Sequence, residues 1–230
     1  MLKLIRLEWK KNNIMKYVWK AFVIVAVLLF MVLSLAAMGE LEEETMPAQW
    51  DSTLKAFVEL FTNMSFIVMT SAMLASFIVN SYKNKTIDLM FSYPISRKKI
   101  VLSQMMAVWI FNFTALVLSK ALIYAVLVMT KGYTHITAED IALGSGMFYI
   151  EIFVNSAVMV SISFIALLIG LKFRSSQVTV IAGFIIVCFT QGNIGTYTLI
   201  GNIPFHAALL VLSAAAVFLT LSKLEIRDVN

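Results

Sequence analysis

The sequence is poor in the residues on which soluble and disulfide-stabilised domains depend. Only 13% of its 230 residues are charged, and it contains 3 Pro, 9 Gly and a single cysteine, Cys188. An ordinary globular chain carries about 25% charged residues, so this chain has too few to cover a core with a polar surface. The low Pro and Gly content excludes disordered and collagen-like classes, and one cysteine excludes an intrachain disulfide.

Long apolar runs are what the chain has in excess, since 60% of its residues are hydrophobic. The hydrocarbon core of a bilayer is about 30 Å thick, and a helix needs about 20 apolar residues to cross it. Six runs are found, of which the fifth is short: 17–38, 56–80, 100–129, 141–171, 178–191 and 204–222. The sequence therefore predicts an all-α integral membrane protein, in which residues 1–230 form one transmembrane domain of six helices.

The net charge of +5 is unevenly placed, and its placement favours membrane topology over nucleic-acid binding. Most of the 18 Lys and Arg residues precede the first run, lie between the second and third or the fourth and fifth, or follow the sixth. Basic residues concentrate on the cytoplasmic side of membrane proteins. We therefore expect a multi-pass protein of the cell (plasma) membrane with both termini in the cytoplasm. A cleaved signal peptide is the rival interpretation of the first run, but its long basic lead favours a retained span.

Residues 1–15 form a separate amphipathic segment. At helical spacing its apolar residues fall on one face and its basic residues on an adjacent face, namely Leu2, Ile5 and Trp9, and Lys3, Arg6 and Lys10. This pattern is typical of a helix lying in the membrane interface, with basic groups near anionic lipid headgroups. The alternative is a simple anchor that sets topology.

Sequence signatures of catalysis and of cofactor binding are absent. There is no G-x-x-x-x-G-K-[ST] phosphate loop, and His135 and His206 lack Cys, Asp or Glu at metal-ligand spacing. Gly144-Ser145-Gly146 is similar to a nucleophile turn but has no positioned histidine base. We therefore expect a chain that is not an enzyme by itself, with no catalytic residue, metal or cofactor of its own.

The most informative segment is the basic loop 81–99, between the second and third runs. Thr86 suits a helix N-cap, Asp88 suits the first turn, and Pro94 prevents the helix from continuing. A short cytoplasmic helix with exposed apolar groups favours the docking of a partner, and the alternative is a helix that dips into lipid. The candidate docking residues are Thr86, Ile87, Asp88, Leu89, Met90, Phe91, Tyr93, Pro94 and Arg97.

Residues 84–97 resemble the cytoplasmic loop of type-2 ATP-binding-cassette (ABC) permeases, the ABC-2 type exporter family. In that family a Gly-Thr-hydrophobic segment leads to a Leu-rich stretch that ends in Pro-Ile/Val-Ser-Arg and enters the third of six helices. Pro94 to Arg97 match this ending, whereas Ser81 and Lys85 stand where the family often has Glu and Gly. The layout of the whole chain is similar too, with an amphipathic N-terminal helix, six spans and a broken segment before the sixth.

The resemblance implies a division of labour between subunits. The permease forms the membrane pathway as a homodimer or heterodimer, and cytoplasmic ABC ATPase subunits, which bind ATP and Mg, dock on the coupling helix in loop 81–99. It also implies export of an amphipathic or hydrophobic cargo (peptide, antibiotic or lipid-like), as in small bacterial permeases for peptide or antibiotic export or self-protection. The polar, Gly-rich residues 191–202 resemble a re-entrant helical hairpin on the outer side, with an ordinary outer loop as the alternative.

Three ionisable residues fall inside the predicted spans: Glu59, Lys120 and Glu151. A charge at mid-membrane costs on the order of 2.5–3.5 kcal/mol by insertion scales, so each is expected to pair or to face water. We favour an ion pair of Lys120 with Glu59 or Glu151 that fixes helix packing. The alternatives are that Lys120 snorkels outward or that the group lines a substrate path. The intramembrane polar candidates are Glu59, Thr62, Asn63, Asn112, Lys120, Glu151 and Asn155.

Two other functional classes are alternatives to the permease. A secondary transporter or channel needs no ATPase partner, but it usually carries mid-membrane carboxylates and helices broken in corresponding positions of two repeats. Neither pattern is found here. A membrane-embedded enzyme needs a convergent acid–base or metal set, which the two histidines do not supply. We therefore predict the permease subunit of an ATP-driven ABC exporter.

Overall fold

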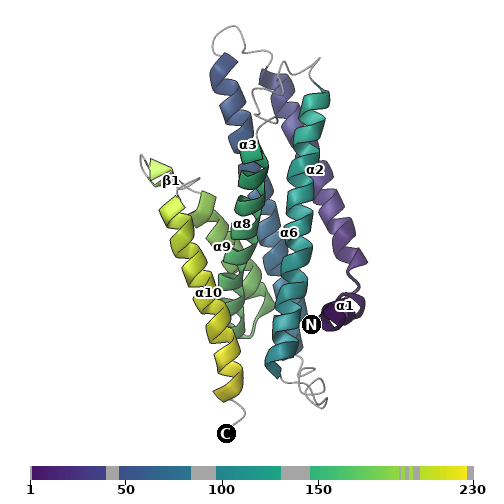
Figure 1. Ribbon diagram of the computed structural model, residues 1–230, viewed down its shortest axis with the longest axis vertical. Coiled ribbons are helices and arrows are strands. Elements are labelled where there is room, and N and C mark those ends of the chain that lie inside the picture. Colours follow the sequence, from purple (N-terminus) through teal and green to yellow (C-terminus); the bar gives the residue numbers. More distant parts are fainter. Residues whose placement is uncertain are drawn as a thin grey trace. The chain divides into compact units, whose positions relative to one another are not determined.

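The computed structural model is almost entirely helical in the residues that it describes (Figure 1). These residues are 2–39, 47–83, 97–130, 146–191, 193–194, 197–198 and 203–226. The elements in chain order are α1 (Leu2–Lys11), α2 (Met15–Gly39), α3 (Pro47–Leu74), the π-helical turn η1 (Ala75–Val79), α4 (Asn80–Lys83), α6 (Arg97–Met129), α8 (Gly146–Phe173), α9 (Ser176–Gln191), β1 (Asn193–Ile194), β2 (Tyr197–Thr198) and α10 (Ile203–Ile226).

Five of the described helices are long and apolar enough to cross a membrane. Their spanning stretches lie in α2, in α3 with η1, in α6, in α8 and in α10, at Met15–Leu35, Lys55–Val79, Lys98–Met129, Gly146–Phe173 and Pro204–Ser222. The fifth predicted run corresponds to α9, whose 16 residues extend about 24 Å at about 1.5 Å per residue. Because that is shorter than a hydrocarbon core of about 30 Å, the count of six spans stays a prediction.

Residues 193–194 and 197–198, between α9 and α10, differ from the expected helical hairpin. Strands β1 and β2 pair antiparallel, with Asn193 opposite Thr198 and Ile194 opposite Tyr197. These four residues are therefore extended, which corrects the helical form expected for them. Ile, Tyr and Thr are residues that favour strands, and a Gly-X pair such as the intervening Gly195-Thr196 is typical of two-residue hairpin loops. Re-entry of this segment into a membrane stays a prediction.

The helices group into two compact units. Unit 1 comprises Met1–Ile14, Phe66–Phe113 and Val158–Asn230, and unit 2 comprises Met15–Ser65 and Thr114–Ala157. Helices α3, α6 and α8 contribute residues to both units. Residues far apart in the sequence therefore meet inside each unit.

Small residues let the helices of unit 1 approach closely. Ile162 and Ala166 of α8 pack with Ala182 and Ile186 of α9 in one core cluster. A Cβ atom added to Gly183 of α9 would lie 2.5 Å from the Cβ of Ser71 on α3. Interfaces between membrane helices are enriched in such small residues, because close backbone approach brings more atoms into contact.

We expect Gly183→Ala to destabilise the protein by about 1–3 kcal/mol, because the added methyl group overpacks the contact with Ser71. The measurement is thermal unfolding in detergent. Gly146→Ala is the matched control, since a Cβ at Gly146 meets nothing within 4 Å. Ser71→Gly combined with Gly183→Ala should recover part of the loss. Equal stability of the two single alanine variants would contradict the close packing.

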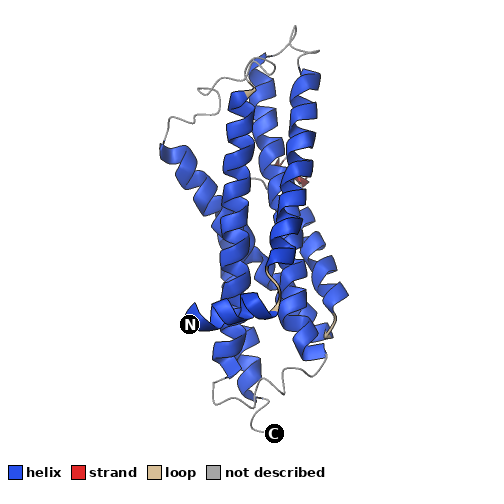
Figure 2. Cartoon of the chain, turned by 90° about the vertical axis from the view of Figure 1, so that its right-hand side faces the viewer, coloured by secondary structure: helices blue, strands red, loops and turns tan. Residues whose placement is uncertain are grey.

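Helix α1 packs on α6 within unit 1. Ile5 and Glu8 are buried, the indole Nε1 of Trp9 donates a hydrogen bond of 3.0 Å to the carbonyl of Ala107, and Gln104 Nε2 donates one of 3.3 Å to a Glu8 carboxylate oxygen. Figure 1 shows α1 beside α6, and Figure 2 shows the N-terminal helix lying crosswise. The sequence assigned Ile5 and Trp9 to a lipid-facing surface. In the structure Trp9 contacts α6 and Ile5 is buried. A position in the membrane interface stays a prediction.

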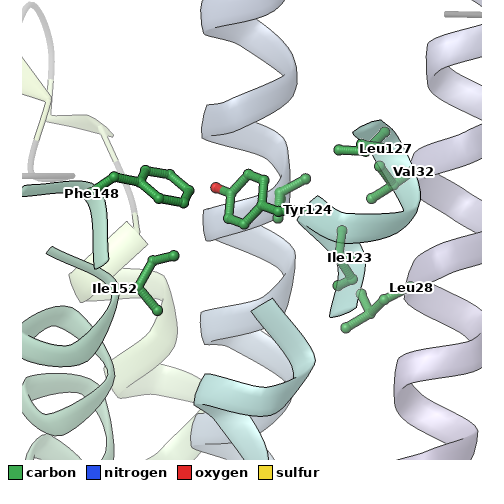
Figure 3. Close-up of a cluster of buried hydrophobic side chains, with 8 residues drawn as sticks. Leu28, Val32, Ile123, Tyr124, Leu127, Phe148 and Ile152 are labelled. Carbon is green, nitrogen blue, oxygen red and sulfur yellow. The ribbon is translucent and has the colours of Figure 1, made fainter. Parts of the chain in front are cut away.

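The core of unit 2 joins α2, α3, α6 and α8. Its buried members are Leu28, Val32, Val58, Ile123, Tyr124, Leu127, Phe148 and Ile152, most of which are labelled in Figure 3. The rings of Tyr124 and Phe148 meet edge to face, with centroids 5.1 Å apart. The ionisable candidates Glu59, Lys120 and Glu151 lie on α3, α6 and α8 within the same unit.

Candidate functional site

The most deeply buried charge in the described chain belongs to Lys120 on α6. Its side chain is fully buried, and its Nζ lies 3.9 Å from an Oε atom of Glu59 on α3. The same Nζ donates a hydrogen bond of 3.0 Å to Asn155 Oδ1 on α8. The structure thus brings together three candidate residues from three helices of unit 2, and it places the Lys120 ammonium inside the unit rather than at an exposed end.

A second ion pair involves Glu151, the remaining ionisable candidate. Lys55 Nζ on α3 lies 3.5 Å from Glu151 Oε2 on α8, and the two side chains are 38% and 57% exposed. Lys55 Nζ also lies 5.6 Å from the centroid of the Phe148 ring. Sequence reasoning missed Lys55 because it placed this residue just before the second span. Its i, i+4 spacing from Glu59 puts the two side chains on one face of α3, which was the available sign that Lys55 lies near the intramembrane charges.

The four charged residues of the two ion pairs, together with Asn155, form what we call the charge cluster: Lys55, Glu59, Lys120, Glu151 and Asn155. Two positive and two negative side chains cancel, so the cluster as a whole carries no net charge. Neutral pairing lowers the cost of keeping charges in an apolar region, whereas removal of one partner leaves an uncompensated buried charge at a cost of about 3–5 kcal/mol. The arrangement therefore ties α3, α6 and α8 together within unit 2.

The other polar candidates divide between the two units. Thr62 is buried and its hydroxyl donates to the Val58 carbonyl of its own helix. Asn63 is buried as well, and within the described residues its Oδ1 has no hydrogen-bond partner. Asn112 belongs to unit 1, where its amide donates to the Val108 carbonyl at 2.9 Å and to a sulfur atom of α3. Asn112 is thus not a member of the charge cluster.

Most of the candidate docking residues lie outside the described residues, namely Thr86, Ile87, Asp88, Leu89, Met90, Phe91, Tyr93 and Pro94. Arg97 is described as the first residue of α6. The elements on either side are anchored within unit 1. Asn80 of α4 accepts a hydrogen bond of 2.8 Å from the hydroxyl of Ser176, at the start of α9. On the other side, α6 holds α1 through Gln104 and Glu8.

Comparison with known proteins supports one family. The family model described as "ABC-2 family transporter protein" matches residues 4–190. The uncharacterized protein YcbO of Bacillus subtilis (strain 168) is 26% identical over 240 aligned positions, which cover 100% of this chain and 98% of the relative. No solved structure gives a significant match. Because the family match covers α1 from residue 4 onward, all of α2, α3, α6 and α8, and α9 up to residue 190, this multi-pass membrane protein belongs to the ABC-2 transporter family.

Proposed function

We propose that this chain is the membrane-spanning permease subunit of an ATP-driven ABC exporter. The observation that carries the proposal is the family match over residues 4–190, which includes the basic loop 81–99. Membership of the family implies a non-catalytic membrane component that works with an ATPase partner and dimerises. In this account ATP and Mg bind to the cytoplasmic ATPase subunits, and the chain itself needs no cofactor.

The contacts around loop 81–99 suit a part that transmits movement. The loop begins within α4, which the Asn80–Ser176 hydrogen bond joins to α9. It ends within α6, to which α1 is held by Trp9 and Glu8. The π-helical turn η1 directly precedes α4, and such turns are frequent at functional sites. Displacement of the loop by a docked ATPase would therefore act on α6, α1 and α9 together.

A pathway between two copies of the chain is the proposed route for an amphipathic or hydrophobic cargo. Apolar side chains dominate the exposed faces of the spanning helices, as at Phe22, Phe30, Val211 and Phe218. The charge cluster is neutral, and we assign its buried part, the contacts of Lys120 with Glu59 and Asn155, to the packing of unit 2. A peptide, an antibiotic or a lipid-like molecule would suit such a surface, and the self-protection systems of bacteria handle cargo of this kind.

An ABC exporter differs from a secondary transporter in its dependence on ATP. The test is reconstitution of the chain in liposomes with its co-expressed ATPase and measurement of ATP hydrolysis. Hydrolysis that changes when the permease is present supports an ABC transporter. A chain that moves solute on an ion gradient alone, with no effect on any ATPase, would be a secondary transporter or channel.

Both termini are proposed to lie in the cytoplasm. Single cysteines introduced into a Cys188→Ser background should report this, because Cys188 is the one native cysteine. Positions Glu43 and Glu139 are expected to react with an impermeant reagent from outside, and Arg97 and Lys172 only after the membrane is opened. Labelling of Glu43 from the cytoplasmic side alone would overturn the orientation.

A further inference from the structure

The contacts of Lys55 are those of a bound cation. Its ammonium lies 3.5 Å from the carboxylate of Glu151 and 5.6 Å from the centre of the Phe148 ring. A carboxylate beside an aromatic face is the combination by which proteins hold ammonium groups, with the ring quadrupole supplying the second attraction. Both Lys55 and Glu151 are substantially exposed, so the pair is accessible and its lysine can move away.

A third group lies against the same aromatic ring. The hydroxyl of Tyr124 is buried and, among the described residues, has no hydrogen-bond partner. Figure 3 shows this hydroxyl pointing toward Phe148, whose ring packs edge to face against the tyrosine ring. A phenolic oxygen accepts hydrogen bonds, so it supplies an acceptor at the inner side of the Phe148 ring.

We propose that Glu151, Phe148 and Tyr124 form a binding site for the ammonium group of an amphipathic ligand, and that Lys55 occupies this site when no ligand is bound. That the ligand is the transported cargo rests on the proposed function. The binding site itself does not.

The charges around the site select a cation. When Lys55 moves away, the remaining charged members of the charge cluster are Glu59, Lys120 and Glu151, which together carry one negative charge. An entering ammonium group restores neutrality, whereas an anion would add to the negative charge in a region of low dielectric.

The surface beside Glu151 suits an apolar tail. Its neighbours on α8 are large and exposed, namely Tyr149, Ile150, Phe153 and Val154. A ligand with an ammonium head and a hydrocarbon tail would thus place its head on Glu151 and its tail along α8. The proposed class of ligand, an amphipathic ammonium compound, follows from both parts. The carboxylate and the aromatic ring suit the ammonium head, and the exposed apolar side chains of α8 suit the tail.

Binding of radiolabelled dodecylammonium, a primary ammonium like that of Lys55, to the full chain in lipid nanodiscs tests the site. Lys55→Met should bind the probe about threefold to tenfold more tightly, since one exposed ion pair and one cation–π contact no longer compete. Lys55→Arg should keep wild-type affinity, and Glu151→Gln should lose about tenfold or more. Lys20→Met is the matched control, because Lys20 also lies over an aromatic ring, that of Tyr17, and its loss should change nothing.

Unchanged affinity in a folded Lys55→Met chain would overturn the proposal, and so would equal binding of dodecyl sulfate. If Lys55→Met fails to fold, Lys55→Gln carries the same expectation. The measurement needs no ATPase. If the wild-type chain does not bind the probe but still couples to an ATPase, only the proposed site is rejected. If the chain binds the probe specifically but engages no ATPase, the transport function is rejected and the site stands.

Discussion

Phe91→Asp is expected to release the ATPase from the permease while leaving the chain inserted and folded. Phe91 belongs to an apolar group in the basic loop 81–99, which is expected to face the cytoplasm, so that only a partner or the membrane interface would bury it. Loss of a well-packed anchor costs about 2 kcal/mol or more of binding, which is about thirtyfold in affinity. The measurements are co-purification of the ATPase with the tagged permease and the ATPase rate in liposomes.

Ser92→Asp is the matched control for this variant. It introduces the same charge at the next position of the loop, but it replaces a polar side chain, so ATPase binding should be largely retained. Pro94→Ala should give an intermediate loss, because proline is expected to end the predicted coupling helix and to restrict the residue before it. Wild-type stoichiometry and wild-type hydrolysis in Phe91→Asp would remove the coupling role and strengthen the case for a secondary transporter.

Lys120→Met is expected to give the largest loss of stability in the membrane domain. The substitution leaves the Glu59 carboxylate without the ammonium that lies 3.9 Å away, and it removes the donor to Asn155. Breaking a buried pair in this way costs about 3–5 kcal/mol. Thermal unfolding in detergent should therefore shift strongly, whereas Ser119→Ala, one position earlier on α6, should have little effect because the Ser119 hydroxyl bonds only within its own helix in the described contacts.

A double-mutant cycle identifies the partner. Glu59→Gln together with Lys120→Met should recover part of the stability, because the double variant leaves no unpaired charge at this position. The double variant Lys120→Met with Glu151→Gln should recover less stability, since Glu151 is paired with Lys55. Interaction energies between contacting residues reach about 0.5–3 kcal/mol. Strict additivity of Lys120→Met with both carboxylate variants would mean that Lys120 is not held by either.

The positions of the helices could be predicted from sequence because a bilayer imposes a length and an apolar composition that hydropathy detects directly. The polar candidates were found for a related reason, since a charge such as Lys120 within a span is costly unless it is satisfied. Which carboxylate it approaches could not be predicted, because Glu59 and Glu151 both fall inside predicted spans and the choice depends on the rotation of α3 and α8.

Three features needed the structure. Lys55 lies at the edge of an apolar run, where a basic residue is normally assigned to the membrane surface, so its pairing with Glu151 was missed. The apolar side of α1 was assigned to lipid, but periodicity does not distinguish lipid from a neighbouring helix, and Trp9 bonds to α6. The extended form of β1 and β2 was missed because the surrounding polar, Gly-rich sequence was interpreted through its resemblance to a helical hairpin.

Co-purification of the wild-type chain with its partners tests the central claim most directly. An affinity tag on the C-terminus, with extraction in mild detergent, should isolate a complex that contains a second permease chain and soluble ABC ATPase chains. The ATPase chains and the permease chains should be present in equal numbers. The complex should hydrolyse ATP at a rate that changes on reconstitution into liposomes. Isolation of the chain without any ATPase, under conditions that preserve its fold, would contradict its assignment as the permease of an ATP-driven exporter.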